Sequence, residues 1–327
     1  MTPLRVGLLS TANINRLLLG GARAAEGVEV VAVASRDRER AESFAAEHGL
    51  GRAHGSYDAL LEDAGVDAVY VPLPNSMHVE WSIRALEAGK HVLCEKPLTR
   101  HPEQAEAAFD AAERAGRVLA EAFMWRHHPQ ALRLRELLAD GAVGSLRLAR
   151  ASFSFDIFGM DRPDDVRLQA GLEGGGLMDV GCYCVSALRL LAGEPERVSG
   201  RRIDGGDGVD VRFTGTLAFA GGVLGSFDCG LDMVARHELE VVGDTGSLVL
   251  ADPWHGRSPT IELRRGPGEA ETVPVASANP YARELEDLAA AVRGEREHPF
   301  GRADAVGQAR TIAALYRAVE SGCDEAV

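Results

Sequence analysis

The sequence predicts an α/β fold, in which a doubly wound parallel sheet is followed by an α+β domain with a large, mostly antiparallel open sheet. Residues 4–122 alternate short apolar runs with amphipathic segments of helix length, a pattern typical of parallel strands joined by helices. From Gly144 onward, strand-like segments follow one another with turn signals between them. The length of 327 residues exceeds what one hydrophobic core usually serves. We therefore expect two domains, residues 1–123 and residues 124–327.

Apolar runs and the residues that interrupt them define the elements of the first domain. Gly89 and Gly116 are expected to end two helices, because glycine readily adopts the left-handed conformation that closes a helix. The predicted strands are Arg5–Leu9, Val28–Ala34, Ala68–Val71, His91–Cys94 and Val118–Ala122, and the helices between them include Glu80–Ala88 and Glu103–Ala115.

The second domain is expected to begin with a helix from Pro129 to Asp140 and to continue mainly as strands. The predicted strands are Leu146–Phe155, Val209–Phe219, Val223–Asp228, Glu238–Val242, Ser247–Leu250 and Ile261–Arg265, with helices at Leu177–Ala192, Tyr281–Val292 and Ala303–Glu320. An open sheet buries one face under its own helices, and its other face must be solvated or covered. We expect apolar residues on both faces of these strands, and therefore a homodimer or homotetramer formed through the sheet.

The composition argues against several classes of partner. The formal net charge is −14, whereas nucleic-acid binding needs clustered Lys and Arg, so no nucleic-acid partner is expected. No continuous apolar stretch reaches the roughly 18–20 residues of a membrane helix, and the chain starts directly in a strand without an apolar leader. These features predict a cytoplasmic protein without membrane contact. The five cysteines lack zinc-like spacing, so we expect reduced thiols and no metal.

The turn after the first strand predicts a dinucleotide site at the edge of a Rossmann-type sheet. Such turns usually read G-x-G-x-x-G/A, and here Ser10, Ala12 and Asn15 stand at those positions. A pyrophosphate needs small side chains and free backbone N–H groups at a helix start, which this turn permits, with Asn13 able to cap the helix. An ordinary strand-helix turn is the alternative. The predicted cofactor contacts are Ser10, Thr11, Ala12, Asn13 and Ile14.

The end of the second predicted strand indicates which nicotinamide cofactor is bound. NAD enzymes usually place an acid there for the ribose hydroxyls, but this chain has Ser35 and Arg36, with Arg40 one helical turn further on. A hydroxyl followed by guanidinium groups suits the 2′-phosphate of NADP. We predict NADP as the cofactor, with use of NAD as the alternative.

A lysine and a tyrosine stand where a dehydrogenase needs groups that handle protons. Lys96 follows a predicted strand, and Tyr183 lies four residues after Asp179 in a predicted helix, which puts these two on one helix face. A cation beside a phenol favours its ionised form, which can take a hydroxyl proton while hydride leaves carbon. The alternative for each residue alone is a solvated lysine or a core tyrosine.

Trp125 and Arg126 follow the last predicted strand of the first domain. An indole at that position can form a wall of the nicotinamide site, and a guanidinium can meet the cofactor phosphates or the substrate. We predict both as cofactor contacts, with a core position as the alternative for Trp125.

Four separated motifs resemble, in the same order, those of the glucose-fructose oxidoreductase, inositol dehydrogenase and MocA (Gfo/Idh/MocA) family. Together with the first strand and turn, they extend from Arg5 to Tyr183. The motifs are Val71–His78 (VPLPNSMH), Glu95–Pro97 (EKP), Glu121–Arg126 (EAFMWR) and the glycine-rich segment 174–183. Many members of this family carry histidine where Tyr183 stands. A tyrosine there is similar to the branch of glucose-fructose oxidoreductase, dimeric dihydrodiol dehydrogenase and the NADP-linked aldose dehydrogenases.

The resemblance implies roles for residues after the third predicted strand of the first domain. It implies that Asn75 and His78 line the nicotinamide ribose, with Pro72 and Leu73 on the adenine side. For His78, a structural role in capping the next helix is the alternative.

The resemblance also implies the geometry of the EKP motif. Glu95 is expected to orient the nicotinamide ribose or the loop that carries Lys96. The bond between Lys96 and Pro97 is implied to be cis, which turns the lysine into the cleft.

These observations predict an NADP-dependent oxidoreductase that transfers a hydride between nicotinamide and a carbon of a sugar or polyol. Tyr183 is the predicted acid/base, Lys96 favours its ionised form and holds the substrate oxygen, and Asp179 binds a neighbouring hydroxyl. The resemblance to the tyrosine branch favours an aldose 1-dehydrogenase of the D-xylose or D-glucose type. The alternatives are reduction of a keto group on a free or nucleotide-linked sugar, oxidation of a cyclic trans-diol, and a non-catalytic dinucleotide sensor.

The segment 156–167 is expected to lie over the substrate pocket. Asp165 and Arg167 are predicted substrate contacts, and Arg162 or Arg167 can meet a nucleotide diphosphate. A loop closed by its own salt bridges is the alternative.

Overall fold

The computed structural model describes residues 2–160, 164–257, 259–266 and 268–327, and its contacts divide the chain into two compact units. The first unit holds the residues up to His127 together with Asn279–Val306, and the second holds His128–Ala278 and Gly307–Val327. This contact-based division differs from the expected one at residue 123, because α8 (Pro280–Val292) belongs to the first unit. It packs closely on α1 (Asn15–Ala24), where a Cβ at Gly21 would lie 2.5 Å from the Cβ of Tyr281.

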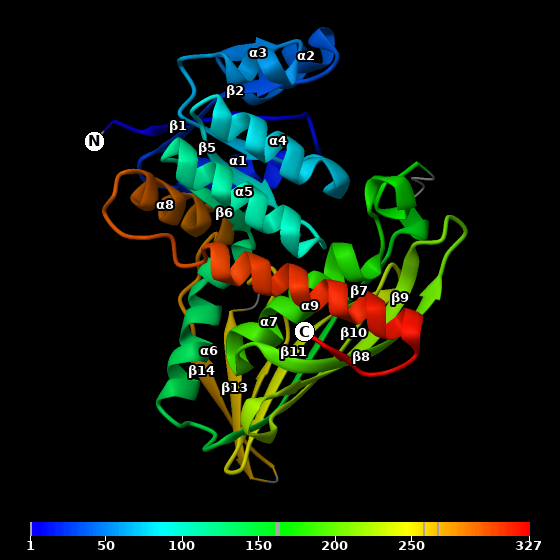
Figure 1. The fold of residues 1–327 in the computed structure, drawn as a ribbon. Coiled ribbons are helices and arrows are strands. Elements are labelled where there is room, and N and C mark those ends of the chain that lie inside the picture. Colours follow the sequence, from blue (N-terminus) through cyan, green and yellow to red (C-terminus); the bar gives the residue numbers. More distant parts are fainter. Residues whose placement is uncertain (1, 161–163, 258, 267) are drawn as a thin grey trace. The chain divides into compact units, whose positions relative to one another are not determined.

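Among the described residues, the first unit forms a six-stranded parallel sheet in the order β3-β2-β1-β4-β5-β6. Figure 1 labels β1, β2, β5 and β6 of this sheet. The strands are β1 (Leu4–Leu8), β2 (Val28–Ala34), β3 (Arg52–His54), β4 (Ala68–Val71), β5 (His91–Glu95) and β6 (Leu119–Ala122). The chain leaves β1 toward β2 and β3, and it resumes at β4 on the other side of β1. Ligands of such sheets bind at the carboxyl ends of the strands beside this reversal. The loops after β1 and β4 therefore lie where a dinucleotide is expected.

The helices of the first unit begin and end at residues suited to those positions. Asp37 caps α2 by accepting a hydrogen bond from the Arg40 N–H at 3.2 Å, and Gly49 ends this helix with φ 73°. Gly116 ends α5 in the same left-handed conformation. The remaining bounds are α2 (Arg38–His48), α3 (Tyr57–Leu61), η1 (Asn75–Met77), α4 (His78–Glu87), α5 (Pro102–Ala115) and η2 (Met124–His127).

The described part of the second unit forms a nine-stranded sheet in the order β14-β13-β12-β11-β7-β10-β9-β8-β15. Its paired strands are antiparallel except for β10 and β7, which run parallel. The strands are β7 (Leu146–Asp156), β8 (Pro195–Asp204), β9 (Asp210–Phe219), β10 (Leu224–Gly230), β11 (Asp232–Gly243), β12 (Ser247–Leu250), β13 (Thr260–Gly266), β14 (Glu269–Pro274) and β15 (Glu325–Ala326).

The two faces of this sheet differ in polarity. On β9, Phe213 and Leu217 are buried, whereas Arg212, Thr214 and Thr216 between and beside them are exposed. Polar residues of neighbouring strands continue the outward face, where Thr216 shares a hydrogen bond of 2.7 Å with Ser199. The expectation of apolar residues on both faces is therefore wrong for β9, because its large apolar residues all have one parity. Assembly through this sheet stays a prediction.

Helices cover the inward face of the sheet. The bounds are α6 (Pro129–Ala139), α7 (Cys182–Ala192) and α9 (Arg302–Ser321), with the short turns η3 (Phe158–Met160), η4 (Val166–Leu168), η5 (Ala170–Leu172), the π-helical η6 (Leu177–Gly181) and η7 (Ala220–Gly222). The ring of Tyr316 on α9 meets Phe213 edge-on at 6.0 Å. Within the described residues, the stretch Ala170–Ala192 is long and apolar enough to cross a membrane, yet 78% of its most apolar part is buried inside the protein.

Candidate active site

The turn after β1 is closed by polar side chains. The Asn15 side chain donates a hydrogen bond to the Ser10 carbonyl oxygen at 2.7 Å, and the Ser10 hydroxyl accepts one from the Ala12 N–H at 3.1 Å. The same hydroxyl donates to the Pro72 carbonyl oxygen at 3.3 Å. These bonds give the turn a fixed shape without the usual glycines, and they join it to the loop after β4.

The residues predicted to contact the cofactor in this turn are only partly buried. Thr11, Ala12 and Ile14 are half-buried and Asn13 is exposed. Ile14 occupies the cap position of α1, and no side chain caps the helix there. The expectation that Asn13 caps this helix is therefore wrong, because Asn15 fixes the turn instead.

Ser35 is held at the end of β2 by its backbone and its hydroxyl. Its N–H donates to the His54 carbonyl oxygen at 3.0 Å, and its hydroxyl accepts from the Asp37 N–H at 3.2 Å. Ser35 is buried, so an acid at this position would need its own partner. Residue 35 therefore offers no carboxylate, the group that usually binds the ribose hydroxyls of NAD.

Two arginines converge near this strand end on a residue that the sequence did not single out. Arg36 and Arg40 are both exposed, and the charge of each acts on the hydroxyl of Tyr57. Burial raises the pKa of Tyr57, while these two charges and a hydrogen bond with Arg36 oppose that rise. The arrangement gathers two cations and a phenol beside Ser35, a donor set that suits a phosphate. Tyr57 lies some twenty residues further along the chain, so spacing alone does not reveal it.

The loop that carries Lys96 is fixed by carboxylates. The Lys96–Pro97 bond is cis, as the family resemblance implies. The Lys96 N–H donates to the Glu95 carboxylate at 3.2 Å, and the Tyr70 hydroxyl also donates to Glu95. Glu121 accepts from the Leu98 N–H at 2.8 Å. Glu95 therefore orients the Lys96 loop, one of the two roles predicted for it.

His78 joins the two loops that follow β4 and β5. Its Nε2 lies 2.7 Å from the Leu73 carbonyl oxygen, and its Nδ1 lies 2.9 Å from the Pro97 carbonyl oxygen. Carbonyl oxygens only accept hydrogen bonds, so the neutral ring donates to one of these two oxygens and only the protonated ring donates to both. The His78 side chain is 1% exposed. His78 therefore bridges the two loops and positions the Lys96 loop, while its contact with the cofactor stays a prediction.

Trp125 and Arg126 are both buried within the first unit. The Arg126 guanidinium pairs with Asp304 and lies over the rings of Phe123 and Phe300, at 4.4 and 4.7 Å from their centres. This setting makes Arg126 part of the packing that ties 279–306 to the first unit. Its contact with the cofactor stays a prediction.

A buried aspartate anchors the glycine-rich segment of the second unit. The Asp210 carboxylate accepts from the Leu177 N–H at 2.6 Å, at the start of η6, and from the Tyr316 hydroxyl at 2.9 Å. Gly175 has φ 124°, and a Cβ there would lie 2.5 Å from the Asp210 carboxylate. Burial raises the pKa of Asp210 to about 6. The glycines therefore let the chain approach the carboxylate closely enough for it to hold the helix that leads to Tyr183.

The guanidinium of Arg167 contacts the other two predicted substrate residues, Asp165 and Asp179. Arg167 forms two hydrogen bonds of 2.8 Å with Asp165, and its Nη1 lies 3.5 Å from the Asp179 carboxylate. These two carboxylates raise the pKa of Arg167 against the effect of its burial. The loop is thus closed by its own salt bridges, the alternative considered above. Arg162 lies outside the described residues.

Tyr183 lies against aromatic walls. Its ring meets Phe153 edge-on at 5.3 Å and Trp254 edge-on at 5.9 Å, and Phe153 stacks on Trp254 at 5.8 Å. The Trp254 indole donates to the Ser152 carbonyl oxygen at 2.9 Å. Tyr183 is 9% exposed. We call Phe153, Tyr183 and Trp254 the aromatic cluster; sequence reasoning missed two of its members, because β7 and the segment before β13 meet only in the folded sheet.

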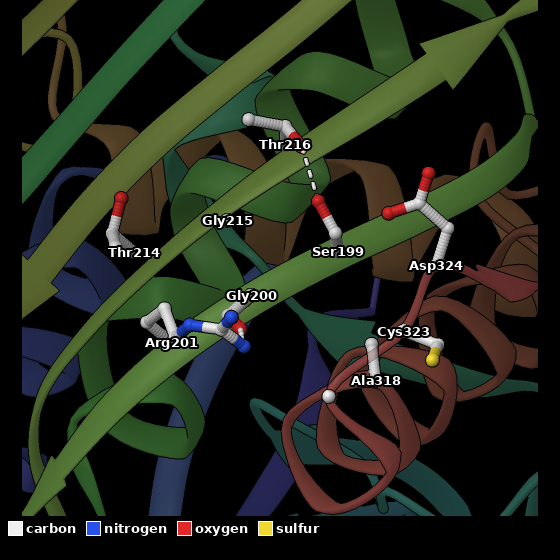
Figure 2. A pocket seen from close by; sticks show the side chains of 10 residues that line it. Ser199, Gly200, Arg201, Thr214, Gly215, Thr216, Ala318, Cys323 and Asp324 are labelled. Atoms are coloured by element: carbon white, nitrogen blue, oxygen red, sulfur yellow. Dashed lines mark hydrogen bonds between the residues drawn. The ribbon is translucent and has the colours of Figure 1, made fainter.

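A surface hollow of about 310 Å³ lies elsewhere in the second unit (Figure 2). It is formed by β8, β9 and the carboxyl end of α9, and the hydrogen bond between Ser199 and Thr216 crosses its lining. Its lining contains none of the residues predicted for catalysis. The hollow is therefore not part of the candidate active site.

The first unit has a Rossmann-type sheet with loops where a dinucleotide is expected. The second unit carries Asp179 and Tyr183 on one helical segment. This combination is typical of a two-domain oxidoreductase. Residues 4–123 match the model of the oxidoreductase family with an NAD-binding Rossmann fold, and residues 131–249 match the GFO/IDH/MocA C-terminal domain. The chain belongs to the Gfo/Idh/MocA family and is an NAD(P)-dependent oxidoreductase.

Three known proteins illustrate the similarity. The chain is 40% identical over 320 residues to D-xylose 1-dehydrogenase (NADP(+)) 2 of Haloferax volcanii, covering 97% of each chain. It is similar to a 3-ketoreductase from Actinomadura kijaniata solved with NADP and TDP-benzene, with TM-score 0.89, 35% identity and coverage of 97% and 98%. It also resembles the aldose-aldose oxidoreductase from Caulobacter crescentus solved with glycerol, with TM-score 0.91, 27% identity and coverage of 99% and 100%.

Proposed function

We propose that this chain is an NADP-dependent aldose 1-dehydrogenase that acts on an aldopentose or aldohexose such as D-xylose or D-glucose. The observation that carries the substrate class is the full-length similarity to an NADP-linked D-xylose 1-dehydrogenase. The tyrosine at position 183, rather than the histidine common in the family, supports the same branch.

The residues at the end of β2 fit NADP. Ser35 presents a small side chain where an acid would repel a 2′-phosphate, and Arg36 and Arg40 supply positive charge beside Tyr57. The turn after β1 offers the small side chains of Ser10, Thr11 and Ala12 to a pyrophosphate. Ser35, Arg36, Arg40 and Tyr57 would hold the 2′-phosphate, and the oxidised cofactor would supply the hydride acceptor for C1 of the sugar.

Tyr183 and Lys96 handle the proton in this proposal. The Tyr183 phenolate takes the C1 hydroxyl proton as the hydride leaves, so that the aldose becomes a lactone. An unperturbed phenol has a pKa near 10 and is a poor base at neutral pH, so the ammonium of Lys96 is needed to favour the phenolate. Glu95 and His78 position the loop of Lys96.

Asp179 and Arg167 hold the sugar in the same proposal. The Asp179 carboxylate accepts a hydrogen bond from a hydroxyl next to C1, and its pairing with Arg167 fixes its orientation. The aromatic cluster supplies an apolar wall for the C–H face of the ring.

The second candidate function is reduction of a keto group on a nucleotide-linked sugar. The similarity to a 3-ketoreductase solved with TDP-benzene favours it. Against it, Arg167 is engaged with Asp165 and Asp179, which leaves less of its charge for a diphosphate. We rank it second for that reason.

A substrate panel tests both candidates. Purified enzyme is assayed for NADPH formation with free aldoses, and for NADPH oxidation with free and nucleotide-linked keto sugars. Formation of an aldonolactone from D-xylose or D-glucose supports the proposal. Turnover only with the nucleotide-linked keto sugar selects the second candidate and rejects the first.

A further inference from the structure

The second unit contains a group of metal-ligand side chains that the proposed reaction does not use. His237 lies on β11, and Asp252 and His255 lie in the segment between β12 and β13. Each of the three offers one ligand atom, and these atoms all lie within 4.8 Å of one another. All three residues are half-buried, so the group is shielded but reachable. We call it the His-Asp-His group.

The sheet and one anchored indole bring these residues together. His237 is paired with Phe153 in the ladder between β11 and β7. Trp254, which lies between Asp252 and His255 in the sequence, is fully buried and is bonded to the Ser152 carbonyl oxygen. Since both sides of the group are attached to neighbouring residues of β7, their approach follows from the core of the fold rather than from a loose loop.

The local geometry keeps the ligand atoms pointed at one another. The His255 Nδ1 lies 3.3 Å from the Asp252 carboxylate, and the rings of His237 and His255 have centres 5.0 Å apart. Gly256 turns the chain with φ 64°, and a Cβ there would lie 2.6 Å from the His128 ring. A side chain at position 256 would therefore strain this turn and clash with the His128 ring.

The protonation states suit metal binding. Burial lowers the pKa of His237 and of His255, and the charge of Arg257 lowers both further. Neutral imidazoles have the free lone pair that a metal needs. The Nδ1 of His237 is buried and has no hydrogen-bond partner among the described residues, an unusual state for a polar atom. The negative charge of the Asp252 carboxylate raises the pKa of both histidines and so acts against the charge of Arg257.

We propose that His237, Asp252 and His255 bind one divalent transition-metal ion of the Zn²⁺ class. Two imidazoles and one carboxylate suit zinc, cobalt or nickel, whereas magnesium and calcium favour all-oxygen sites. With metal-ligand bonds of about 2.0–2.1 Å, tetrahedral ligand atoms lie roughly 3.4 Å apart. The side chains therefore close by at most about 1.4 Å from the 4.8 Å spread. The three residues leave the fourth position for water.

The ion would clamp the segment before β13 to β11. That segment carries Trp254, whose ring contacts Phe153 and Tyr183. Metal binding would therefore hold one wall of the aromatic cluster in place without touching Tyr183 itself. This role is independent of which sugar the enzyme oxidises.

Cobalt titration of the full-length, tag-free protein tests the proposal. The exposed thiol of Cys323 is first replaced in every sample, Cys323→Ser, because an accessible thiol binds metal by itself. Visible absorption of Co²⁺ reports ligand number, and Zn²⁺ competition with equilibrium dialysis reports stoichiometry. We expect one ion per chain, displaced by Zn²⁺ and not by Mg²⁺. Zn²⁺ is also expected to raise the melting temperature.

Single substitutions locate the ion. His237→Ala, Asp252→Asn and His255→Ala should each weaken Co²⁺ binding by more than about tenfold, and Asp252→Asn should abolish the thermal shift. The matched control is His101→Ala, which removes a half-buried histidine of the first unit, 3.8 Å from Glu103. If circular dichroism shows that an alanine variant is unfolded, His237→Gln and Asp252→Asn carry the test. Absence of saturable binding, or binding unchanged in these two variants, overturns the proposal, and neither result depends on enzyme activity.

Discussion

The hydroxyl of Tyr183 is the smallest group on which the proposed reaction depends. Its ring is fixed by Phe153 and Trp254, so removing the oxygen changes the chemistry more than the packing. Tyr183→Phe should lower kcat by about 10²- to 10⁴-fold, the usual worth of a positioned acid or base. Steady-state kinetics with cofactor binding measured by fluorescence check this, and cofactor affinity should stay nearly constant.

The matched control and a double variant sharpen that prediction. Tyr281→Phe removes a phenol oxygen on α8 and should leave kcat nearly unchanged. Lys96→Met should slow turnover, and the combination with Tyr183→Phe should be much less than additively worse, because the two groups act as one unit. A Tyr183→Phe enzyme with normal kcat would remove Tyr183 from the mechanism.

Cofactor choice is the second prediction at this scale. Replacing both guanidinium groups near Ser35, as Arg36→Ala with Arg40→Ala, should lower the preference for NADP over NAD by about one to two decades, since charge-assisted hydrogen bonds contribute about 1.5–3 kcal/mol. The ratio of kcat/KM for the two cofactors measures the preference. Arg38→Ala on the same helix is the control, because Arg38 is exposed and paired with Glu42. A wild-type enzyme that favours NAD contradicts the assignment.

The element that presents Asp179 and Tyr183 depends on glycine. Gly175→Ala puts a side chain at φ 124° and a Cβ 2.5 Å from the Asp210 carboxylate. We expect the free energy of unfolding to fall by about 1–3 kcal/mol. Gly171→Ala is the control, since a Cβ there meets nothing within 4 Å, and it should change stability by less than about 0.5 kcal/mol. Urea unfolding compares the two, and equal losses would argue against the close approach.

The same element should show a pH dependence. The pKa of Asp210 is raised by burial from 3.8 to about 6 in the folded protein. The folded state therefore holds this proton more tightly, and the resulting stability is present below about pH 4 and lost as the pH rises through 6. Relative to Asp210→Asn, the wild type should lose up to about 3 kcal/mol of unfolding free energy across that range. Urea titrations from pH 4 to 7 measure the difference; a difference constant with pH excludes this titration.

Elements with a clear apolar period could be predicted from the sequence, and weakly apolar ones could not. The strands β1, β2, β4, β5 and β6 follow buried runs and lie close to their predicted bounds. The strand β3 is only three residues long and has polar residues, Arg52 and His54, at both ends, and β8 begins at Pro195 and is rich in arginine, so neither resembles a strand locally. Both obtain their strand character from pairing with a neighbour.

Some residues of the candidate site could also be predicted from the sequence, and others could not. Motifs within one segment, such as Ser35–Arg36 and Glu95–Pro97, could be predicted from the sequence alone. Tyr57, Phe153 and Trp254 join the site through contacts between segments distant in sequence. The His-Asp-His group was missed for the same reason, because its members come from β11 and the segment after β12.

At the scale of the whole molecule, the first unit is built from two separate stretches of chain. Leu285 and Leu288 on α8 belong to the same buried cluster as Leu18 and Leu19 on α1. A fragment of residues 1–127 lacks these partners and should not unfold cooperatively, whereas the same fragment joined through a flexible linker to residues 279–300 should. Thermal melts followed by circular dichroism compare the two. A cooperative melt of residues 1–127 alone would mean that α8 is dispensable.

The return of α8 also sets the order in which the protein can fold as it is made. The residues of β1 to β6 are synthesised first. The apolar face of α1 stays uncovered until Leu285 and Leu288 on α8 have been synthesised. At about 5–20 residues per second, residues 128–278 take on the order of ten seconds or more to synthesise. Throughout that interval the nascent chain exposes the surface that α8 later covers. We therefore expect chaperones that bind apolar segments to meet this protein during translation rather than after release.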